Sequence, residues 1–383
     1  CIRDRNWIAQ EQPEIWSATD KFLFLSGYLN YRLSGAFVDS VACQAGYVPF
    51  DYRRQRWAGP RHWIWRLAPI TRGMLPELKP AGAVLGTISD AAALETGIPA
   101  GLPLIAAAGD KACEVLGSGC TKPGLAHISL GTTANVNVTT TRYIEPIRLV
   151  PPYPAAVPGR FNAEVQIFRG YWMVSWFRDQ FGYREQLASE RLNVPVEALF
   201  DELAEAAPAG SMGLMLQPYR SPGLREPGPE AKGAMVGFGD VHNRAHIYRA
   251  ILEGIAYALR EGFERIERRT GQRAARLRVT GGGANSDAAL QLTADVFGLS
   301  AARPHVTETS GLGAAICAAV GIGWHRDFDA AVEAMTREER VFEPDAARQQ
   351  LYDRLYRRVY RKMYRRLAPL YREIRDITGY PAS

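Results

Sequence analysis

The sequence has few of the residues on which disulfide frameworks and metal sites depend. Its 383 residues include five cysteines, an odd number, and none of them forms a C-x-x-C pair. A disulfide framework or a zinc site is therefore not expected. Scattered cysteines fit a reducing compartment, so we expect a cytoplasmic protein. No apolar run is long enough to cross a bilayer, and the sequence predicts no membrane segment.

Familiar nucleotide and metal motifs are also missing. The P-loop pattern G-x-x-x-x-G-K-[ST] does not occur, and in the run Gly281 to Ser286 the third glycine of G-x-G-x-x-G is replaced by Ser286. A nucleotide bound here would need another architecture. His242 and His246 have a metal-binding i, i+4 spacing, but Asn243 stands where the zincin pattern needs glutamate. Two histidines near the start of a helix are favoured instead, and no metal ligands are predicted.

Basic residues are concentrated near the end of the chain, from Tyr356 to Arg366, and the formal net charge is +6. Such a cluster is found in nucleic-acid and membrane patches. It is also found on the solvated face of an amphipathic helix, which we favour because apolar residues recur there every four positions. We therefore expect neither a nucleic-acid nor a membrane partner. The apolar positions are Leu351, Leu355, Val359, Met363 and Leu367.

Three glycine-containing turns follow strand-like segments. Asp110 comes directly after the apolar run Leu104 to Ala108, where ligands bind in open α/β sheets. Its carboxylate suits a general base or a metal ligand, and capping of the next helix is an equally good interpretation.

The second turn, Gly131-Thr132-Thr133, lies between two strand patterns and offers backbone N–H groups and hydroxyls to a phosphate; a plain hairpin is the alternative. The third turn, at Gly281, lies between a strand and a helix, where backbone approaches a nucleotide closely. Strands alternate with long helices along the chain, which predicts an α/β fold.

In chain order, these segments resemble the FGGY family of carbohydrate kinases, which includes xylulokinase, ribulokinase and glycerol kinase. Ala108 to Lys111 resembles the G-D-Q segment that carries the catalytic base, and Ile128 to Thr133 resembles the phosphate hairpin I-S-L-G-T-S. The remaining matches are Phe22 to Gly35, Gly281 to Ser286, Ala294-Asp295, Gly298-Leu299, Arg303-Pro304 and Glu308 to Ala315.

The resemblance implies two actin-like, ribonuclease H-like domains around a cleft. It divides the chain into residues 1–124 of an N-terminal kinase domain, a C-terminal nucleotide-side domain over 125–325, and a helical extension over 326–383 packed on the second domain. The family opens with a D-x-G-T-T hairpin that does not precede Trp7. We therefore expect the first domain to be incomplete and an N-terminal portion to be absent.

The resemblance also implies a reaction and its residues. ATP, with Mg²⁺, would phosphorylate a sugar or polyol hydroxyl, a pentulose such as xylulose being favoured. Asp110 would be the base, and Asp110 and Lys111 would bind the substrate; the family usually has Gln or Asn at the lysine position. ATP would contact Gly131, Thr132, Thr133, Gly282, Gly283 and Asn285. A homodimer is compatible with the family, and a non-catalytic sugar or nucleotide sensor is the alternative.

Overall fold

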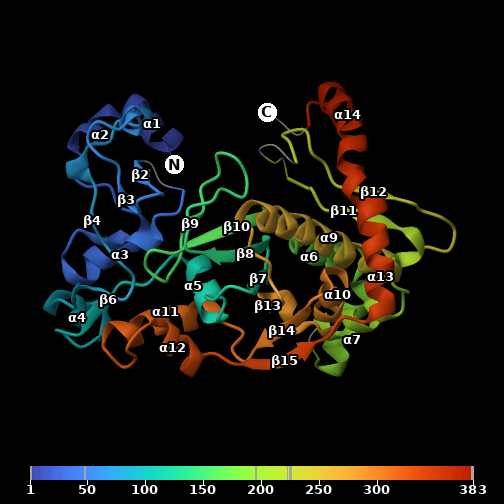
Figure 1. The fold of residues 1–383 in the computed structure, drawn as a ribbon. Helices are drawn as coiled ribbons and strands as arrows, with labels where there is room; N and C mark the ends of the chain where they lie inside the picture. The colour runs from blue at the N-terminus through green and yellow to red at the C-terminus, as the bar shows by residue number, and fades with distance from the viewer. Residues whose placement is uncertain (1, 47–48, 195, 222, 224–226, 381–383) are drawn as a thin grey trace. The chain divides into compact units, whose positions relative to one another are not determined.

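The computed structural model describes residues 2–46, 49–194, 196–221, 223 and 227–380 (Figure 1). It consists of two compact units, each assembled from separate stretches of chain. The first contains Cys1–Lys122, Thr139–Ala163 and Glu308–Arg337, and the second contains Pro123–Val138, Glu164–Thr307 and Glu338–Ser383. Both units mix helices and strands, which confirms the α/β class. The predicted boundaries after residues 124 and 325 stay a prediction.

The first unit combines helices with short strand pairs. β1 pairs with β4 in parallel, while β2 pairs with β3 and β5 with β6 in antiparallel fashion. Its strands are β1 (Val38–Ser40), β2 (Phe50–Asp51), β3 (Arg56–Trp57), β4 (Glu77–Lys79), β5 (Val84–Thr87) and β6 (Pro103–Ile105). Its helices are α1 (Ile2–Glu11), α2 (Pro13–Ala18), α3 (Leu25–Ser34), α4 (Asp90–Thr96), α5 (Asp110–Gly117), α11 (Thr309–Gly321) and α12 (Phe328–Met335), with 3-10 turns η1 (Val41–Cys43), η2 (Trp63–Leu67) and η3 (Arg72–Met74).

The strand predicted over Leu104 to Ala108 is shorter than expected. β6 ends at Ile105, where its pairing with β5 also ends, and Leu104 and Ile105 are only half-buried. Of the small residues that follow, Ala107 and Ala108 pack against the core that includes residues of α5, α11 and α12, and Ala106 is buried with Val38 and Leu85. The unbroken apolar run therefore predicted both a longer strand and a deeper burial than the structure has, since Ala106 alone of the five residues is buried.

The second unit is built on a mixed sheet in the order β15-β14-β13-β7-β8-β10-β9. β13 runs parallel to both β7 and β14, and β8 pairs with β7 in antiparallel fashion. The sheet strands are β7 (Leu125–Leu130), β8 (Ala134–Thr140), β9 (Tyr153–Pro154), β10 (Phe161–Ile167), β13 (Arg276–Thr280), β14 (Ser300–Pro304) and β15 (Glu338–Phe342). β9 and the adjoining ends of β8 and β10 are counted with the first unit. A separate pair consists of β11 (Met215–Gln217) and β12 (Ala234–Val236).

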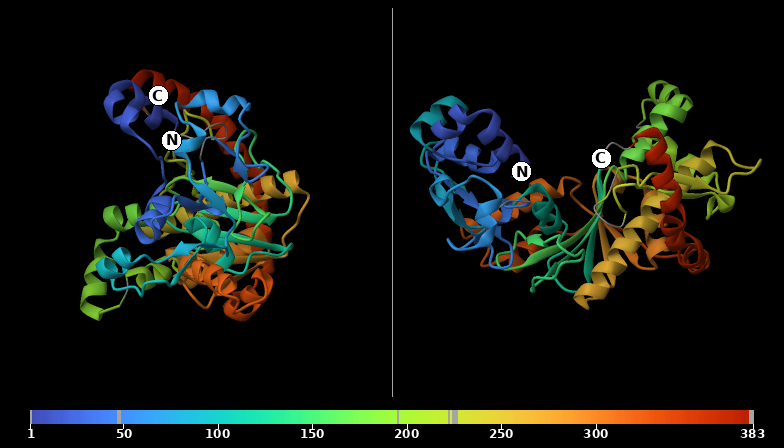
Figure 2. Two further views of the ribbon diagram at one scale, coloured as in Figure 1. Left: turned by 90° about the vertical axis from the view of Figure 1, so that its left-hand side faces the viewer. Right: turned by 90° about the horizontal axis from the view of Figure 1, so that it is seen from above.

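Helices cover this sheet (Figure 2), and the longest, α9, packs against it. Gly262 of α9 faces Val165 of β10 and Val136 of β8 so closely that an added methyl group would lie 2.8 Å from the Val165 side chain. His242 and His246 lie near the start of α9, as predicted, and there Asn243 and His246 form a capping box. The helices are α6 (Trp172–Phe181), α7 (Tyr183–Leu192), α8 (Val196–Glu205), α9 (Arg244–Thr270), α10 (Asp287–Phe297), α13 (Ala346–Leu355) and α14 (Arg361–Thr378), with turns η4 (Ser211–Gly213), η5 (Gly282–Asn285) and the π-helical η6 (Tyr356–Tyr360).

The stretch 141–170, expected to be mostly loop, contains β10. Phe161, Ala163, Val165 and Ile167 alternate with polar residues, which is the period-two signal of a strand, and all four are buried. The proline-rich first half of the stretch suggests that most of it is loop. The pattern was therefore present in the sequence and was missed.

The predicted apolar stripe at the end of the chain is also partly wrong. Tyrosines rather than aliphatic residues form the buried stripe: Tyr352, Tyr356 and Tyr360 are fully buried, whereas Val359 is 41% exposed. Two of these rings pack on Tyr257 of α9, with centroids 6.1 and 5.2 Å away. The tyrosines lie one position beyond the aliphatic series, so the helix is rotated by about 100° from the expected orientation.

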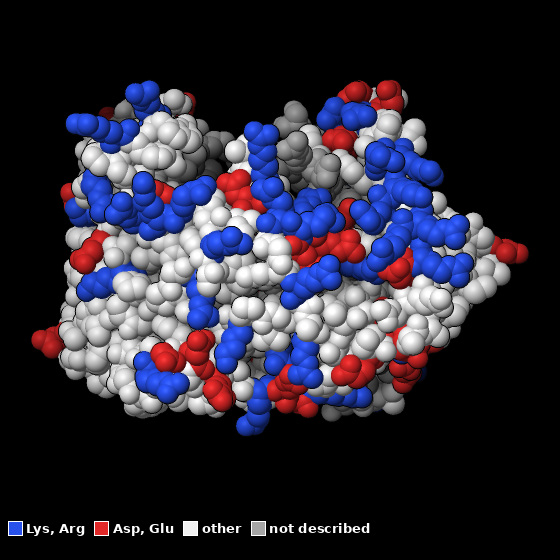
Figure 3. Space-filling view, in the orientation of Figure 1, with Lys and Arg blue, Asp and Glu red and all other residues white. Residues whose placement is uncertain are grey.

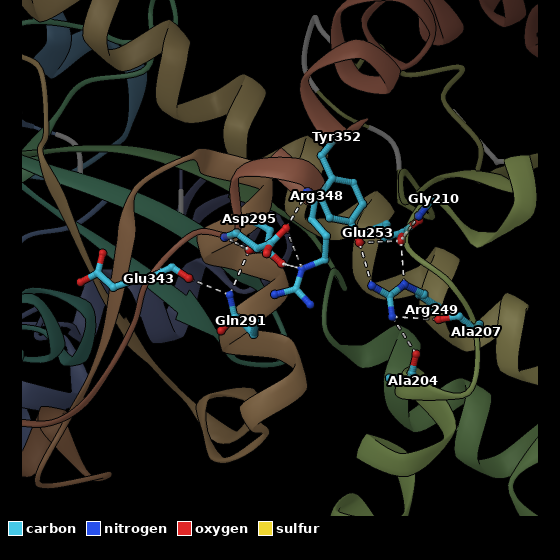
Figure 4. Close-up of polar contacts among 11 residues, drawn as sticks. Ala204, Ala207, Gly210, Arg249, Glu253, Gln291, Asp295, Glu343, Arg348 and Tyr352 are labelled. Atoms are coloured by element: carbon cyan, nitrogen blue, oxygen red, sulfur yellow. Dashed lines mark hydrogen bonds and ion pairs between the residues drawn. The ribbon is translucent and has the colours of Figure 1, made fainter. Parts of the chain in front are cut away.

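A buried polar network anchors this terminal helix (Figure 4). The carboxylate of Glu253 accepts hydrogen bonds from Arg249 Nε at 3.0 Å, Gly210 N at 2.8 Å and Tyr352 Oη at 2.9 Å. Arg249 also donates to the carbonyl of Ala204 at 2.9 Å. One carboxylate thus serves donors from α9, α13 and the N-cap of η4, and its loss would leave the partly buried Arg249 without its ionic partner.

Candidate active site

Asp110 is the first residue of α5, and its side chain is exposed. The N-cap position belongs to Gly109, whose own N–H donates to the carbonyl of Ala42 at 3.1 Å. Asp110 is therefore not the N-cap of α5, as the capping interpretation predicted, but the residue that follows the N-cap. Its Oδ1 accepts the N–H of Lys111 at 2.7 Å, and no other hydrogen bond to this carboxylate occurs within the described ranges. The second oxygen of this exposed carboxylate therefore has no hydrogen-bond donor among the described residues.

The helix that carries Asp110 is fixed by direct backbone contact with α11. A methyl group on Gly313 of α11 would lie 2.6 Å from the carbonyl carbon of Cys113, and one on Gly117 of α5 would lie 2.8 Å from the nitrogen of Gly313. Only glycine permits this approach. The segment Glu308 to Ala315 thus belongs with the helix of Asp110, a placement that sequence reasoning did not find.

Lys111 does not turn towards Asp110. Its ammonium pairs with Glu114 Oε2 at 2.8 Å, one helical turn further on, and the Glu114 side chain is only 7% exposed. A half-buried ammonium therefore stands one position after the exposed carboxylate and is itself oriented by a buried acid.

Sequence reasoning missed a buried carboxylate that supports the turn before Asp110. Asp39 accepts hydrogen bonds from Ser26 Oγ at 2.9 Å, Ser40 N at 2.7 Å and Gln44 Nε2 at 3.0 Å, and burial raises its pKa. These contacts hold η1, whose Ala42 carbonyl receives the Gly109 N–H. The only signal available in the sequence was an Asp-Ser pair ahead of a small-residue segment.

The other two turns meet in the second unit. β7 and β13 are parallel, with Ser129 opposite Thr280, so their carboxyl ends lie at the same edge of the sheet. Gly281 has φ +82°, and a methyl group on it would lie 2.9 Å from the nitrogen of Gly131. The structure therefore brings together the phosphate-type turn and the glycine turn that the sequence singled out.

The two turns present backbone and hydroxyl groups to solvent. Thr132, Gly282 and Asn285 are exposed, and a methyl group on Gly282 would meet no atom within 4 Å. The carbonyl of Thr132 accepts the N–H of Trp172 at 3.3 Å, which fixes the first turn on α6. The open positions are thus those at which a ligand can approach the chain.

Gly283 differs from its neighbours because the ring of Tyr171 covers it. A methyl group there would collide with that ring and with Leu130, so glycine is required for packing. Burial raises the pKa of the Tyr171 hydroxyl, and the nearby Asp201 carboxylate raises it further.

Asp201 of α8 holds the end of the glycine turn. It accepts a hydrogen bond from Ser286 Oγ and another from the N–H of Asp287 at 3.1 Å, and burial raises its pKa. Arg303 donates to the Ala284 carbonyl at 2.7 Å. Tyr171, Asp201 and Arg303 were not predicted as site residues, because nothing in their local sequence shows which turn they contact.

The predicted residues are divided between the units. Asp110 and Lys111 lie in the first, and the six predicted nucleotide contacts lie in the second. In the described part of the chain, no three His, Cys, Asp or Glu side chains are grouped as a metal would require. No helix among the described residues is both long and apolar enough to span a membrane.

Comparison with family models matches two regions of the chain. Residues 5–117 match the N-terminal domain of the FGGY family of carbohydrate kinases, and residues 126–322 match its C-terminal domain.

Curated proteins with similar sequences are named as sugar kinases. An uncharacterized sugar kinase of Escherichia coli K12 is 35% identical over 331 residues, covering 86% of this chain and 66% of its own length. A xylulose kinase of Staphylococcus epidermidis is 29% identical, covering 91% and 67%. The chain thus spans about two thirds of the length of these relatives. The crystal structure of xylulose kinase from Rhodospirillum rubrum superimposes with a TM-score of 0.82 at 26% identity, over 97% of this chain and 72% of that one.

Proposed function

Because the chain belongs to the FGGY family of carbohydrate kinases, whose structures have two actin-like domains, we propose that it transfers the γ-phosphoryl group of ATP to a hydroxyl of a sugar or polyol. The observation that carries the proposal is the meeting of the Gly131 and Gly281 turns at one edge of the sheet. Two adjacent turns with exposed N–H and hydroxyl groups suit a chain of phosphates.

In this proposal Asp110 is the general base. Its carboxylate takes the proton of the substrate hydroxyl while that oxygen attacks the γ-phosphorus in line, and ADP leaves. Gly131, Thr132 and Thr133 bind the β- and γ-phosphates through backbone N–H groups and hydroxyls. Gly282 and Asn285 contact the adenosine, and Gly283 keeps the turn closed against Tyr171.

Magnesium fits this arrangement as an ion held by the nucleotide. The described residues offer no cluster of three metal-ligating side chains, and Mg²⁺ commonly keeps several waters while binding substrate phosphates. When bound, it would neutralise phosphate charge. The hydroxyls of Thr132 and Thr133, which lie beside the proposed phosphate positions, are the side chains suited to contact its waters.

We favour a pentulose such as xylulose as substrate, because relatives and structural neighbours include xylulose kinases. A relative from Enterobacter is named autoinducer-2 kinase, so other polyols belong in the comparison. The half-buried Lys111 lies beside the base and would contact the substrate. We further propose a cytoplasmic enzyme that acts on small molecules and is able to form a homodimer.

The test of the base compares two aspartates at equivalent helix positions. Asp90 is the exposed first residue of α4, as Asp110 is of α5. In the full-length protein, Asp110→Asn should lower kcat for sugar-dependent ADP formation by about 10²–10⁴-fold. Asp90→Asn should leave it unchanged. Near wild-type turnover in Asp110→Asn would remove the base from the proposal.

A panel of ketoses and polyols, assayed for ADP release, tests the substrate. We expect the highest kcat/KM with a pentulose. A clear preference for an acyclic polyol or an aldonate would reject that choice while leaving the kinase assignment intact.

A further inference from the structure

A strongly basic hollow lies in the second unit, between α9, η6 and α14, with Tyr219, Pro227 and Glu230 on its remaining wall. Its volume is 620 Å³, within the range of small-molecule sites. Six cationic side chains line it, against two carboxylates, and none of the predicted site residues does. The charged lining residues are Arg265, Arg357, Arg361, Lys362, Arg365, Arg372, Glu230 and Glu261.

Three of the lining cations lack a carboxylate partner. Lys362, Arg365 and Arg372 are exposed, and they form neither an ion pair nor a side-chain hydrogen bond with any described residue. Lys362 and Arg365 lie about one turn apart in α14, and Arg372 lies about two turns further on. In the space-filling view, Lys and Arg side chains gather over the part of the second unit that α14 occupies in Figure 1 (Figure 3). Like charges held this close repel one another, which a bound anion would relieve.

The two carboxylates in the hollow are already engaged by tyrosines. Glu230 accepts the hydroxyl of Tyr364 at 2.8 Å, and Glu261 accepts that of Tyr219 at 3.2 Å. The Tyr364 hydroxyl in turn accepts the N–H of Gly228 at 2.6 Å. The acids therefore fix the wall of the hollow, and the arginines of α14 remain available to a ligand.

The size of the hollow and the placement of its cations favour a small anion with several charged oxygens. The cations from Arg361 to Arg372 extend over about 17 Å of helix at 1.5 Å per residue. Arg265 faces them from α9. Cations that converge on a hollow from two helices match the several oxygens of linked phosphates, and arginine binds phosphate oxygens in pairs. An extended nucleic acid would instead need a long continuous basic groove.

We infer that this hollow is a second anion site, which binds a small molecule that carries two or more phosphate groups. The inference goes beyond the proposed phosphoryl transfer and does not depend on it. The sequence cluster from Tyr356 to Arg366, which we expected to be a solvated helix face, thereby has a ligand-binding side and a free side. Arg358 and Arg366 are exposed, do not line the hollow, and mark the free side.

The experiment uses inorganic pyrophosphate as the probe and calorimetric titration of the full-length protein. One variant, Arg365→Glu with Arg372→Glu, reverses two charges in the hollow. Its matched control, Arg358→Glu with Arg366→Glu, makes the same change in net charge on the free side. Neither pair of substitutions lies at the Gly131 turn, so both variants should bind pyrophosphate there equally. The affinity of the hollow is therefore read from the difference in Kd between the two variants.

We expect the Kd for pyrophosphate to rise by about tenfold or more in the hollow variant and by less than about twofold in the control, and the wild-type affinity to fall with added salt. An equal rise in the Kd for pyrophosphate in both variants, or no binding of pyrophosphate to the wild type, overturns the inference. A short single-stranded DNA that binds more tightly than pyrophosphate and is lost in both variants overturns it as well. If the charge-reversed protein fails to fold, the same titration is made with Arg365→Gln and Arg372→Gln combined. The Kd for pyrophosphate should again rise.

Discussion

Replacing Gly313 by alanine tests how α5, and with it Asp110, is held. The new methyl group would lie 2.6 Å from the carbonyl carbon of Cys113 and 2.7 Å from its Cα. Carbon atoms pack at about 3.5–4.0 Å, so the helices must separate by about 1 Å. The obstruction is backbone on both sides, and no side-chain rotation relieves it.

The cost follows from the contacts that this separation weakens. A gap of this size forfeits a quarter to a half of each contact energy across the interface, which includes the buried Leu116, Ile316 and Cys317. With overpacking added, we expect a loss of about 3–5 kcal/mol, reduced by about 1 kcal/mol because alanine favours a helix over glycine. The net fall in the free energy of unfolding is thus about 2–4 kcal/mol.

Urea unfolding of the full-length protein measures this fall, with Gly311→Ala as the control. Gly311 lies in the same helix, is exposed, and an added methyl group would meet only the Glu308 side chain at 3.4 Å. That variant should be as stable as the wild type or slightly more stable. If the two variants unfold at the same urea concentration, the close backbone contact between α5 and α11 does not exist as described.

Three further predictions concern the buried acids and the glycine turn. Burial raises the pKa of Asp39 above its ordinary 3.8, so the folded state binds this proton more tightly than the unfolded state does. The stability of the wild type should therefore fall, relative to Asp39→Asn, as the pH rises above about 3.8, and parallel urea-stability curves would contradict this. Glu253→Ala should lower the free energy of unfolding by about 3–5 kcal/mol, because the buried carboxylate is removed and the partly buried Arg249 loses its partner. A loss below about 1 kcal/mol would contradict this role of the network. Gly281→Ala should raise the Kd for ATP by about tenfold, because both the φ of +82° and the neighbouring Gly131 turn exclude a side chain at this position. Gly271→Ala is the control: its φ is +71°, an added methyl group would meet no atom within 4 Å, and ATP binding should be unchanged.

Local sequence patterns predicted the turns of the site well. Each of the Asp110, Gly131 and Gly281 turns follows a strand and precedes a helix or a second strand, as glycine placement and apolar runs indicated. Turn chemistry depends on neighbouring residues, so one sequence suffices to find it. The meeting of the Gly131 and Gly281 turns followed from a parallel pairing of β7 with β13, which residue spacing alone did not predict.

Contacts between distant segments were harder to predict. The packing of Gly313 on α5 joins residues about two hundred positions apart, and the glycines gave no sign of their partner. The helix α7, rich in good helix formers, was overlooked. The buried face of the terminal helix was placed on aliphatic residues because hydropathy ranks them above tyrosine. Stacking of Tyr356 and Tyr360 on Tyr257 decided the orientation instead.

The central claim is that Asp110 performs chemistry rather than building the site. The most direct measurement follows phosphate transfer from ATP to the sugar by ³¹P NMR in wild type and Asp110→Asn, with the Kd for ATP measured on the same samples. If Asp110 is the base, the variant should have an ATP Kd within about twofold of the wild type and a transfer rate lower by about 10²–10⁴-fold. Sugar phosphate formed at the wild-type rate, or ATP binding lost together with transfer, would contradict this role of Asp110.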